Sequence, residues 1–232
     1  PIIGLLVVGY LGPETYGQYA SALAVTAFFG FLCDFGVQQT VLKFGATQQR
    51  LGSILKLGSL VSLAYTVFTI SLVLSWIHAL DYNPLVRQLV MLQCIGFFRT
   101  PLLSLVTAGL QIRGQYGRIA FWNITSAGIQ WTGTLGAMIL GWDVVLLTAV
   151  PIFASLLVVL IMVLIEGRRL GVFSQTGLEP SVRSFIGESW KFGTAGTIYQ
   201  IYHRGDAAIL SATAPAVEVG YYSVVMKLGD LL

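Results

Sequence analysis

The sequence contains few charged residues. Lys, Arg, Asp and Glu make up 10% of its 232 residues, whereas soluble domains carry about 25%. Because so few charges cannot cover a water-facing surface, a soluble enzyme and a disordered chain are excluded. The net charge of +3 on so apolar a chain fits a membrane protein with basic loops better than a nucleic-acid-binding protein. We therefore expect no nucleic-acid partner.

Cysteine and long polar connections are also scarce. Cys33 and Cys94 lie in separate apolar runs without CxxC spacing, so we expect no disulfide framework, no metal site and no cofactor. The longest connection, from Glu166 to Arg183, has no room for an extramembrane catalytic domain. No connection carries the carboxylate pair of a membrane-embedded glycosyltransferase or polymerase. We expect that the protein is not an enzyme, with such a transferase or polymerase kept as an alternative.

Long apolar runs dominate the chain, which has 56% apolar residues and a mean hydropathy of +0.80. A membrane-spanning helix needs about 20 apolar residues. Charges delimit six windows of that length, at residues 14–34, 56–81, 87–113, 118–143, 143–166 and 191–218. Lipid requires backbone groups to be paired within each span. The sequence therefore predicts an all-α integral membrane protein with six complete spans.

Two shorter apolar runs, at residues 1–10 and 219–232, predict parts of two further spans. We therefore expect the chain to be a piece of a longer protein.

The basic residues predict the orientation of these spans. Three connections contain eight of them: Lys43, Arg50, Lys56, Arg113, Arg118, Arg168, Arg169 and Arg183. The alternate connections, at 11–15, 78–84, 141–143 and 211–217, contain no Lys or Arg. By the positive-inside rule we expect a protein of the cell (inner) membrane whose basic connections and N-terminus lie on the cytoplasmic side.

Arg99 lies near the middle of window 87–113, where a charge is costly and indicates a function. Pro101 frees the carbonyl of Phe97, so the helix is expected to kink beside the arginine. Gln88 lies close to the same helical face. We expect Arg99 and Gln88 to contact an anionic substrate in a wet cavity. The alternative is a structural arginine paired with a carboxylate or with freed carbonyls.

Window 191–218 carries a second polar cluster. At about 100° per residue, one helix face carries the side chains Tyr199, Tyr202, His203 and Asp206. Gln200 and Arg204 are expected on the other side, so that one face lines a cavity and the other contacts a neighbouring helix. We assign Tyr199, Tyr202 and Arg204 to substrate binding, and His203 and Asp206 to gating or coupling. The alternative is two separate interhelical polar contacts.

Window 118–143 has no internal charge but carries a polar stripe of Asn123, Ser126, Gln130 and Thr134. This spacing predicts a hydrated or helix-facing surface, and we assign Asn123 and Gln130 to substrate binding. Asp34 ends window 14–34 near the expected cytoplasmic boundary, where it either caps or pairs locally or serves in gating. Glu188 and Lys191, three residues apart, predict a solvated helical pair.

Two stretches resemble the bacterial polysaccharide (O-antigen-type) flippases of the multidrug/oligosaccharidyl-lipid/polysaccharide exporter superfamily. They are LGPETYGQYA at 11–20, continuing to DFG at 34–36, and YHRGD at 202–206, followed by VGYYS at 219–223. The hydropathy pattern between them is similar throughout. A weak internal repeat, GQY at 17–19 and GYY at 220–222, agrees with repeated transporter halves.

The resemblance implies two six-helix lobes around a central cavity. Residues 1–170 would then form helices 1 (partial) to 6 of the first lobe, 171–183 a cytoplasmic linker, and 184–232 helix 7 and the start of helix 8. It also implies transport of a lipid-pyrophosphate-linked oligosaccharide from the cytoplasmic to the outer leaflet by alternating access. Arg99, Arg204 and Asp34 match the family's basic cavity by location only.

The resemblance implies partners as well. Besides the lipid-linked oligosaccharide these are membrane lipids and, as a further expectation, sugar transferases or polymerases. The alternative within the superfamily is a drug or cation antiporter, whose cavity is expected to be lined by acids.

Overall fold

The computed structural model describes residues 2–46, 51–172 and 181–229, and every regular element within them is a helix. The predicted all-α class is therefore confirmed. The elements are α1 (Ile2–Gly30), the 3₁₀ turn η1 (Phe31–Cys33), α2 (Val37–Gly45), α3 (Leu51–Ala79), α4 (Pro84–Phe97), α5 (Arg99–Ile112), α6 (Tyr116–Ile139), α7 (Val144–Arg169), α8 (Val182–Thr213) and α9 (Ala216–Gly229).

Four helical segments are long and apolar enough to cross a membrane. They are Leu6–Gly45, Leu51–Ala79, Pro84–Ile112 and Val144–Arg169, and they correspond to four of the six predicted windows. The other two windows, 118–143 and 191–218, fold as the long but more polar helices α6 and α8. These two helices carry the polar clusters found in the sequence.

The predicted connection at 11–15 coincides with a sharp break: the helix labelled α1 consists of two helical segments that meet at a kink at Gly12. Gly12 has φ +71° and ψ 167°, and Pro13 follows inside the helix. Glycine adopts this backbone conformation without a Cβ clash, and proline has no N–H to continue the helical ladder. The segment before the kink reaches the α6–α7 connection, where the Tyr10 hydroxyl donates to the Trp142 carbonyl at 2.8 Å.

The predicted kink beside Arg99 is confirmed. Helix α4 ends at Phe97 and α5 begins at Arg99, while the Phe98 N–H turns back to the Ile95 carbonyl at 3.3 Å. The break follows Phe97, the residue four before Pro101, whose carbonyl loses its helical hydrogen bond to the proline.

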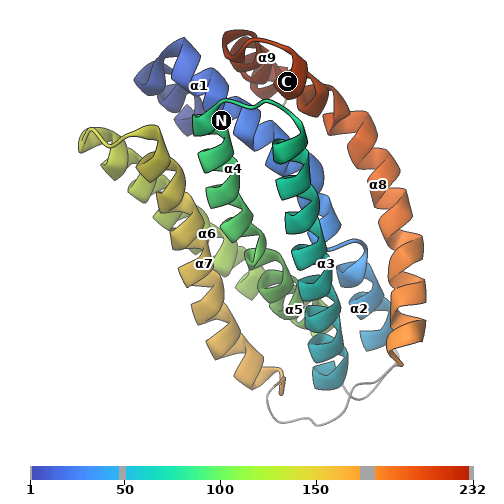
Figure 1. Ribbon diagram of the computed structural model, residues 1–232. Helices are drawn as coiled ribbons and strands as arrows, with labels where there is room; N and C mark the ends of the chain where they lie inside the picture. Colours follow the sequence, from blue (N-terminus) through green and yellow to red (C-terminus); the bar gives the residue numbers. More distant parts are fainter. Residues whose placement is uncertain (1, 47–50, 173–180, 230–232) are drawn as a thin grey trace.

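The helices form a bundle in which α6 and α7 lie at one side and α8 at the opposite side (Figure 1). Helices α1, α3, α4 and α5 lie between them and bury the apolar core. Helix α9 packs most extensively on α1. Large apolar side chains such as Phe68, Ile124 and Ile139 are exposed on the outside, as expected for a surface in contact with lipid. The outer surface of the bundle is therefore suited to the hydrocarbon interior of a membrane.

The helix ends that border the basic connections lie together at one end of the bundle, which we call the basic end. In Figure 1 this is the lower end, where α2, α5 and α7 finish and α3, α6 and α8 begin. Contacts tie the ends together: Arg118 pairs with the buried Glu166 at 2.8 Å, and Arg113 donates to the Arg169 carbonyl at 3.0 Å. Arg50 and most of the predicted linker 171–183 lie outside the described residues.

Candidate functional site

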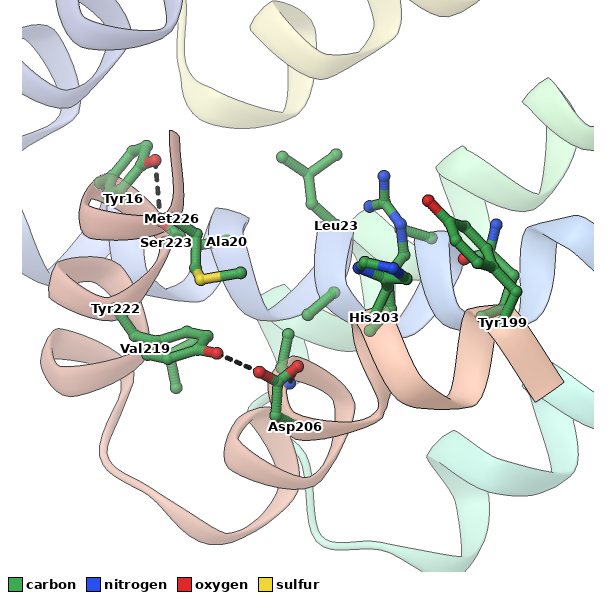
Figure 2. Close-up of a pocket in the computed structure, with 15 residues that line it drawn as sticks. Tyr16, Ala20, Leu23, Tyr199, His203, Asp206, Val219, Tyr222, Ser223 and Met226 are labelled. Atoms are coloured by element: carbon green, nitrogen blue, oxygen red, sulfur yellow. Dashed lines mark hydrogen bonds between the residues drawn. The ribbon is translucent and has the colours of Figure 1, made fainter. Parts of the chain in front are cut away.

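A cavity of about 490 Å³ lies between α1, α8 and α9. Figure 2 shows side chains from all three helices around it. Apolar residues of α1, including Ala20, Leu23 and Ala27, form one wall. The polar groups are Tyr16 from α1, a cluster from α8, and Tyr222 and Ser223 from α9: the α8 cluster consists of Tyr199, Gln200, His203, Arg204 and Asp206.

Gln200 and Arg204 line the same cavity as Tyr199, His203 and Asp206, instead of lying on a separate face of α8. At about 100° per residue, the α8 side chains from Asp206 round to Arg204 span an arc of roughly 160°. Since α1 and α9 both contact α8, one cavity covers this whole arc. Tyr202 lies beyond the edge of the arc, does not line the cavity and is 83% exposed.

The carboxylate of Asp206 is occupied by hydrogen bonds. The Tyr222 hydroxyl donates to Oδ2 (Figure 2), and the Ala207 N–H donates to Oδ1 at 2.6 Å. The bond to Tyr222 joins α8 to α9 across the cavity. On the opposite wall the Tyr16 hydroxyl and Ser223 Oγ lie 2.9 Å apart, so α1 is joined to α9 in the same way.

Arg204, by contrast, makes no hydrogen bond or ion pair with any residue that the structure describes, so its charge is open to the cavity. Beside it the ring of His203 packs on Tyr199 with centroids 4.2 Å apart. The Oε1 atom of Gln200 is buried and has no partner among the described residues. The arrangement offers a free guanidinium, an aromatic surface and an amide whose oxygen has no partner among the described residues, which suit an anionic group attached to a polar ring.

A single protein-family model matches the whole of the described chain. The model of the "Polysaccharide biosynthesis protein" family matches residues 2–232. The chain belongs to this family. No curated protein and no solved structure shows significant similarity to it. The resemblance inferred from the two short motifs is thus confirmed over nearly the full sequence.

In this polysaccharide biosynthesis family member, close backbone contacts bound the cavity on both sides. Toward the kink of α1, a Cβ added to Gly17 would lie 1.8 Å from the carbonyl oxygen of Ala216, and one added to Gly220 would lie 3.2 Å from the Gly17 Cα. The two copies of the internal repeat therefore meet here. Only residues without a side chain allow α1 and α9 to approach so closely.

Toward the basic end, the loop before α2 packs against α8. A Cβ on Gly193 would lie 2.6 Å from the Phe35 ring, and Ser189 Oγ donates to the Phe35 carbonyl at 2.6 Å. Phe35 has φ +33°, the only positive φ of a non-glycine residue in the described chain. Gly36, at φ +77°, completes this sharp turn. The loop is held in a costly conformation by its contacts with α8.

A cluster of charges lies just beyond this turn. Glu188 of α8 contacts Lys43 of α2 at 2.7 Å and Lys191 at 2.8 Å. Hydrogen bonds from the two ammonium groups lower the pKa of Glu188 to about 2, so it is ionised at neutral pH. The predicted pair of Glu188 and Lys191 is confirmed, and Lys43 adds a link between α2 and α8 that the sequence did not indicate. We call this cluster the basic-end latch.

The remaining predicted site residues lie elsewhere. Arg99 is half-buried at the α4–α5 break and makes no hydrogen bond or ion pair with the described part of the chain. Gln88 is exposed on α4. Neither lines the α1–α8–α9 cavity, so their contact with a substrate stays a prediction.

The polar stripe of α6 is also distant from this cavity. Asn123 is exposed, and Gln130 donates to the Ser126 carbonyl and hydroxyl at 3.1 and 2.8 Å. Helix α6 packs chiefly on α7. Substrate binding by Asn123 and Gln130 stays a prediction that the geometry does not support directly.

Asp34 accepts a hydrogen bond from the Gln38 N–H at 3.3 Å, so it caps the start of α2, as one of its two predicted roles requires. Its Oδ1 atom is buried without a partner among the described residues. Within those residues no group of three or more His, Cys, Asp or Glu side chains could hold a metal ion.

Sequence reasoning missed the walls that α1 and α9 contribute. Tyr16 and Tyr222 lie in the two stretches that carry the family resemblance, and that position was the available signal. Both use their hydroxyl groups to join α9 to a neighbouring helix. Their role depends on the packing of α9 against α1 and α8, which helical periodicity does not give.

Proposed function

We propose that the protein is a flippase that carries lipid-pyrophosphate-linked oligosaccharides from the cytoplasmic to the outer leaflet of the cell membrane. One observation carries this proposal: Arg204 faces the α1–α8–α9 cavity without a carboxylate partner among the described residues, next to the rings of Tyr199 and His203. Membership of the polysaccharide biosynthesis family supports it. The pyrophosphate is the anion that an open guanidinium binds by forked, charge-assisted hydrogen bonds.

The cavity removes the main barrier to crossing. A sugar chain that enters hydrocarbon leaves many hydroxyl groups without partners, each at a cost of several kcal/mol. Polar side chains of α8 and α9 replace the lost hydrogen bonds with water, while the lipid tail stays in the bilayer. Tyr199 and Tyr222 add aromatic surface on which the apolar face of a sugar ring can pack.

The orientation of the protein, and with it the direction of transport, follows from the distribution of the basic residues. The positive-inside rule places the basic end in the cytoplasm, and we propose six complete spans, including α6 and α8, with the N-terminus on the cytoplasmic side. The basic-end latch and the turn at Phe35 hold α2 against α8 on that side. Alternating access then requires these contacts to open when the substrate enters from the cytoplasm. Asp34, in the turn, and His203 and Asp206, in the cavity, are placed to respond to that motion.

A drug or cation antiporter is the second candidate, and the cavity argues against it. A cationic substrate needs a free carboxylate, but Asp206 already accepts hydrogen bonds from Tyr222 and Ala207. Arg204 is the charged group of the cavity that makes no hydrogen bond with the described residues. We further propose that sugar transferases supply the substrate and polymerases consume it, because the cavity only moves a finished lipid-linked unit.

The proposal is tested with Arg204→Ala and Arg99→Ala in the complete protein, expressed in cells that lack the native gene. We expect Arg204→Ala to abolish surface polysaccharide while lipid-linked repeat units accumulate in the inner leaflet, and Arg99→Ala to do the same if it contacts the substrate. Arg183→Ala is the matched control, because Arg183 is exposed at the start of α8, outside the cavity. Normal export by Arg204→Ala, at normal membrane levels, would overturn the assignment.

A further inference from the structure

A second cavity, of about 290 Å³, lies on the other side of α1, between α1, α4 and α7. Leu23 and Ala27 belong to the walls of both cavities, so the two adjoin at this point of α1. The second cavity is separate from the charged side chains of α8. Its polar groups are all uncharged: Tyr19, Thr26, Gln93 and Thr148.

Gln93 is the unusual member of this wall. It is only 8% exposed, and its side-chain oxygen contacts the Thr26 hydroxyl of α1. Its Nε2 atom is buried and has no hydrogen-bond partner in the part of the chain that the structure describes. If the amide were turned over, Nε2 would face Thr26 and Oε1 would be left open instead. In either orientation Gln93 presents one unmatched amide atom, and buried polar groups normally have partners.

The rest of the wall restricts the occupant. Apolar atoms make up most of the surface, with contributions from Phe97, Pro151 and Ile152. The Thr148 hydroxyl already donates to the Val144 carbonyl at 2.7 Å. A group with many hydroxyls would leave several of them without partners here. The wall instead fits one amide group that carries a small apolar substituent.

We propose that this second cavity binds the acetamido group of an N-acetylated sugar in the lipid-linked substrate. The acetamido carbonyl or N–H pairs with whichever atom of the Gln93 amide is open, and the methyl group packs against Phe97 and Ile152. This inference rests on the proposed function, because the adjoining α1–α8–α9 cavity would hold the pyrophosphate at Arg204. The site makes the protein selective for an amino sugar close to the pyrophosphate.

The test measures binding to the complete protein in lipid nanodiscs with three lipid pyrophosphate probes. One carries N-acetylglucosamine, one carries glucose, and one carries no sugar. The first two differ only in an acetamido group against a hydroxyl. We expect the wild type to bind the N-acetylglucosamine probe about tenfold more tightly than the glucose probe. Gln93→Met should reduce this ratio to less than twofold and leave the affinity for the sugar-free probe unchanged.

Gln115→Met is the matched control, because Gln115 is half-buried before α6 and outside both cavities; it should keep the tenfold ratio. Ile152→Phe fills the cavity from the opposite wall without altering Gln93, and it should also remove the preference. A wild type without preference, or a Gln93→Met protein that keeps it, overturns the site.

These outcomes are distinguishable from failure of the proposed function. If the sugar-free probe binds and Arg204→Ala weakens it, the pyrophosphate assignment stands whatever Gln93 does. If none of the three probes binds to the folded wild type, the proposed function fails and this inference fails with it.

Discussion

Helices α6 and α8 have similar sequences in one respect: both carry polar side chains at helical spacing inside windows that are long enough to cross a membrane. The structure uses them differently. In α6 two members of the polar stripe bond to their own helix, Gln130 to Ser126 and Thr134 to the Gln130 carbonyl at 2.8 Å. In α8 Arg204 and Gln200 keep unmatched atoms at the cavity.

The difference teaches how a polar stripe in a membrane helix should be interpreted. Serine, threonine and glutamine can satisfy their hydrogen bonds on the preceding turn, so their periodicity does not show what the face contacts. The hydrogen bonds of an arginine cannot be satisfied on its own helix as easily, because the guanidinium has five donors and no acceptor. We therefore expect substitutions on the α6–α7 side to change stability, and substitutions in the α8 cavity to change transport.

The largest effect on stability is expected from Arg118→Met. Among the described residues it leaves Glu166, whose side chain is 4% exposed, with Arg169 at 3.8 Å and the Trp122 N–H at 3.3 Å. We expect the free energy of unfolding to fall by about 2 kcal/mol, less than the ~3–5 kcal/mol of a fully buried pair, because two partners remain. Reversible unfolding in mixed micelles measures it.

The double variant Arg118→Met, Glu166→Met is the control for that measurement. It removes the stranded carboxylate, so it should recover most of the lost stability. A double variant as unstable as the single one would show that packing of Arg118, not its charge, is responsible. Transport per folded molecule should stay normal in both variants.

The next prediction is a difference in transport rate between substitutions of two tyrosines that are similarly exposed. Tyr199 in the α8 cavity is 61% exposed and Tyr116 in α6 is 63% exposed. Tyr199→Ala should lower the transport rate about tenfold, which corresponds to roughly 1.4 kcal/mol, because the aromatic surface for the sugar is lost. Tyr116→Ala should leave the rate unchanged. Equal rates for the two variants in a proteoliposome assay would remove the distinction between the helices.

A smaller effect of opposite sign is expected from Asp206→Asn. The carboxylate shares the cavity with Arg204, so its removal leaves the cavity more positive. We expect affinity for a sugar-free lipid pyrophosphate to rise about fivefold, in line with roughly 1 kcal/mol between charges in a partly hydrated site. Asp143→Asn, at the start of α7, should leave affinity unchanged. An unchanged or weaker affinity for Asp206→Asn would contradict the assigned cavity charge.

The smallest effect concerns the basic-end latch and its pH dependence. Lys191 and Lys43 lower the pKa of Glu188 to about 2, so the stabilisation by this carboxylate is complete above the unfolded pKa of about 4.5 and is lost as pH falls toward 2. The melting temperature of Glu188→Gln should therefore lie slightly below that of the wild type by a constant amount from pH 8 to pH 5.5. A gap that narrows within that range would contradict the lowered pKa.

Much of the fold follows from the sequence, because charges and prolines act locally. The kink at Arg99 was predictable from Pro101 alone, since the missing N–H affects a fixed position in the same helix. For the Gly12-Pro13 pair the position of the break was predictable but its form was not, because such a pair permits either a loop or a kink. The choice depends on where the preceding segment packs, and the contact of Tyr10 with Trp142 lies far away in the sequence.

The site was predictable only in part, for a related reason. The cluster in α8 was visible because charged groups are rare in apolar windows. Its partners Tyr16 and Tyr222 have no such signature, and helical periodicity gives directions relative to one helix only. Gln93 was a lone amide in an apolar run, and its unmatched atom depends on Thr26 of another helix.

The close approach at Gly17 has a consequence for how the sequence can change over generations. A mutation to alanine would place a methyl carbon far closer to the Ala216 carbonyl oxygen than van der Waals contact allows, so α1 and α9 would have to separate. Gly9, Gly117 and Gly128 carry no such restriction, because an added Cβ there meets nothing within 4 Å. Natural variants should therefore retain glycine at 17 while these three positions drift freely.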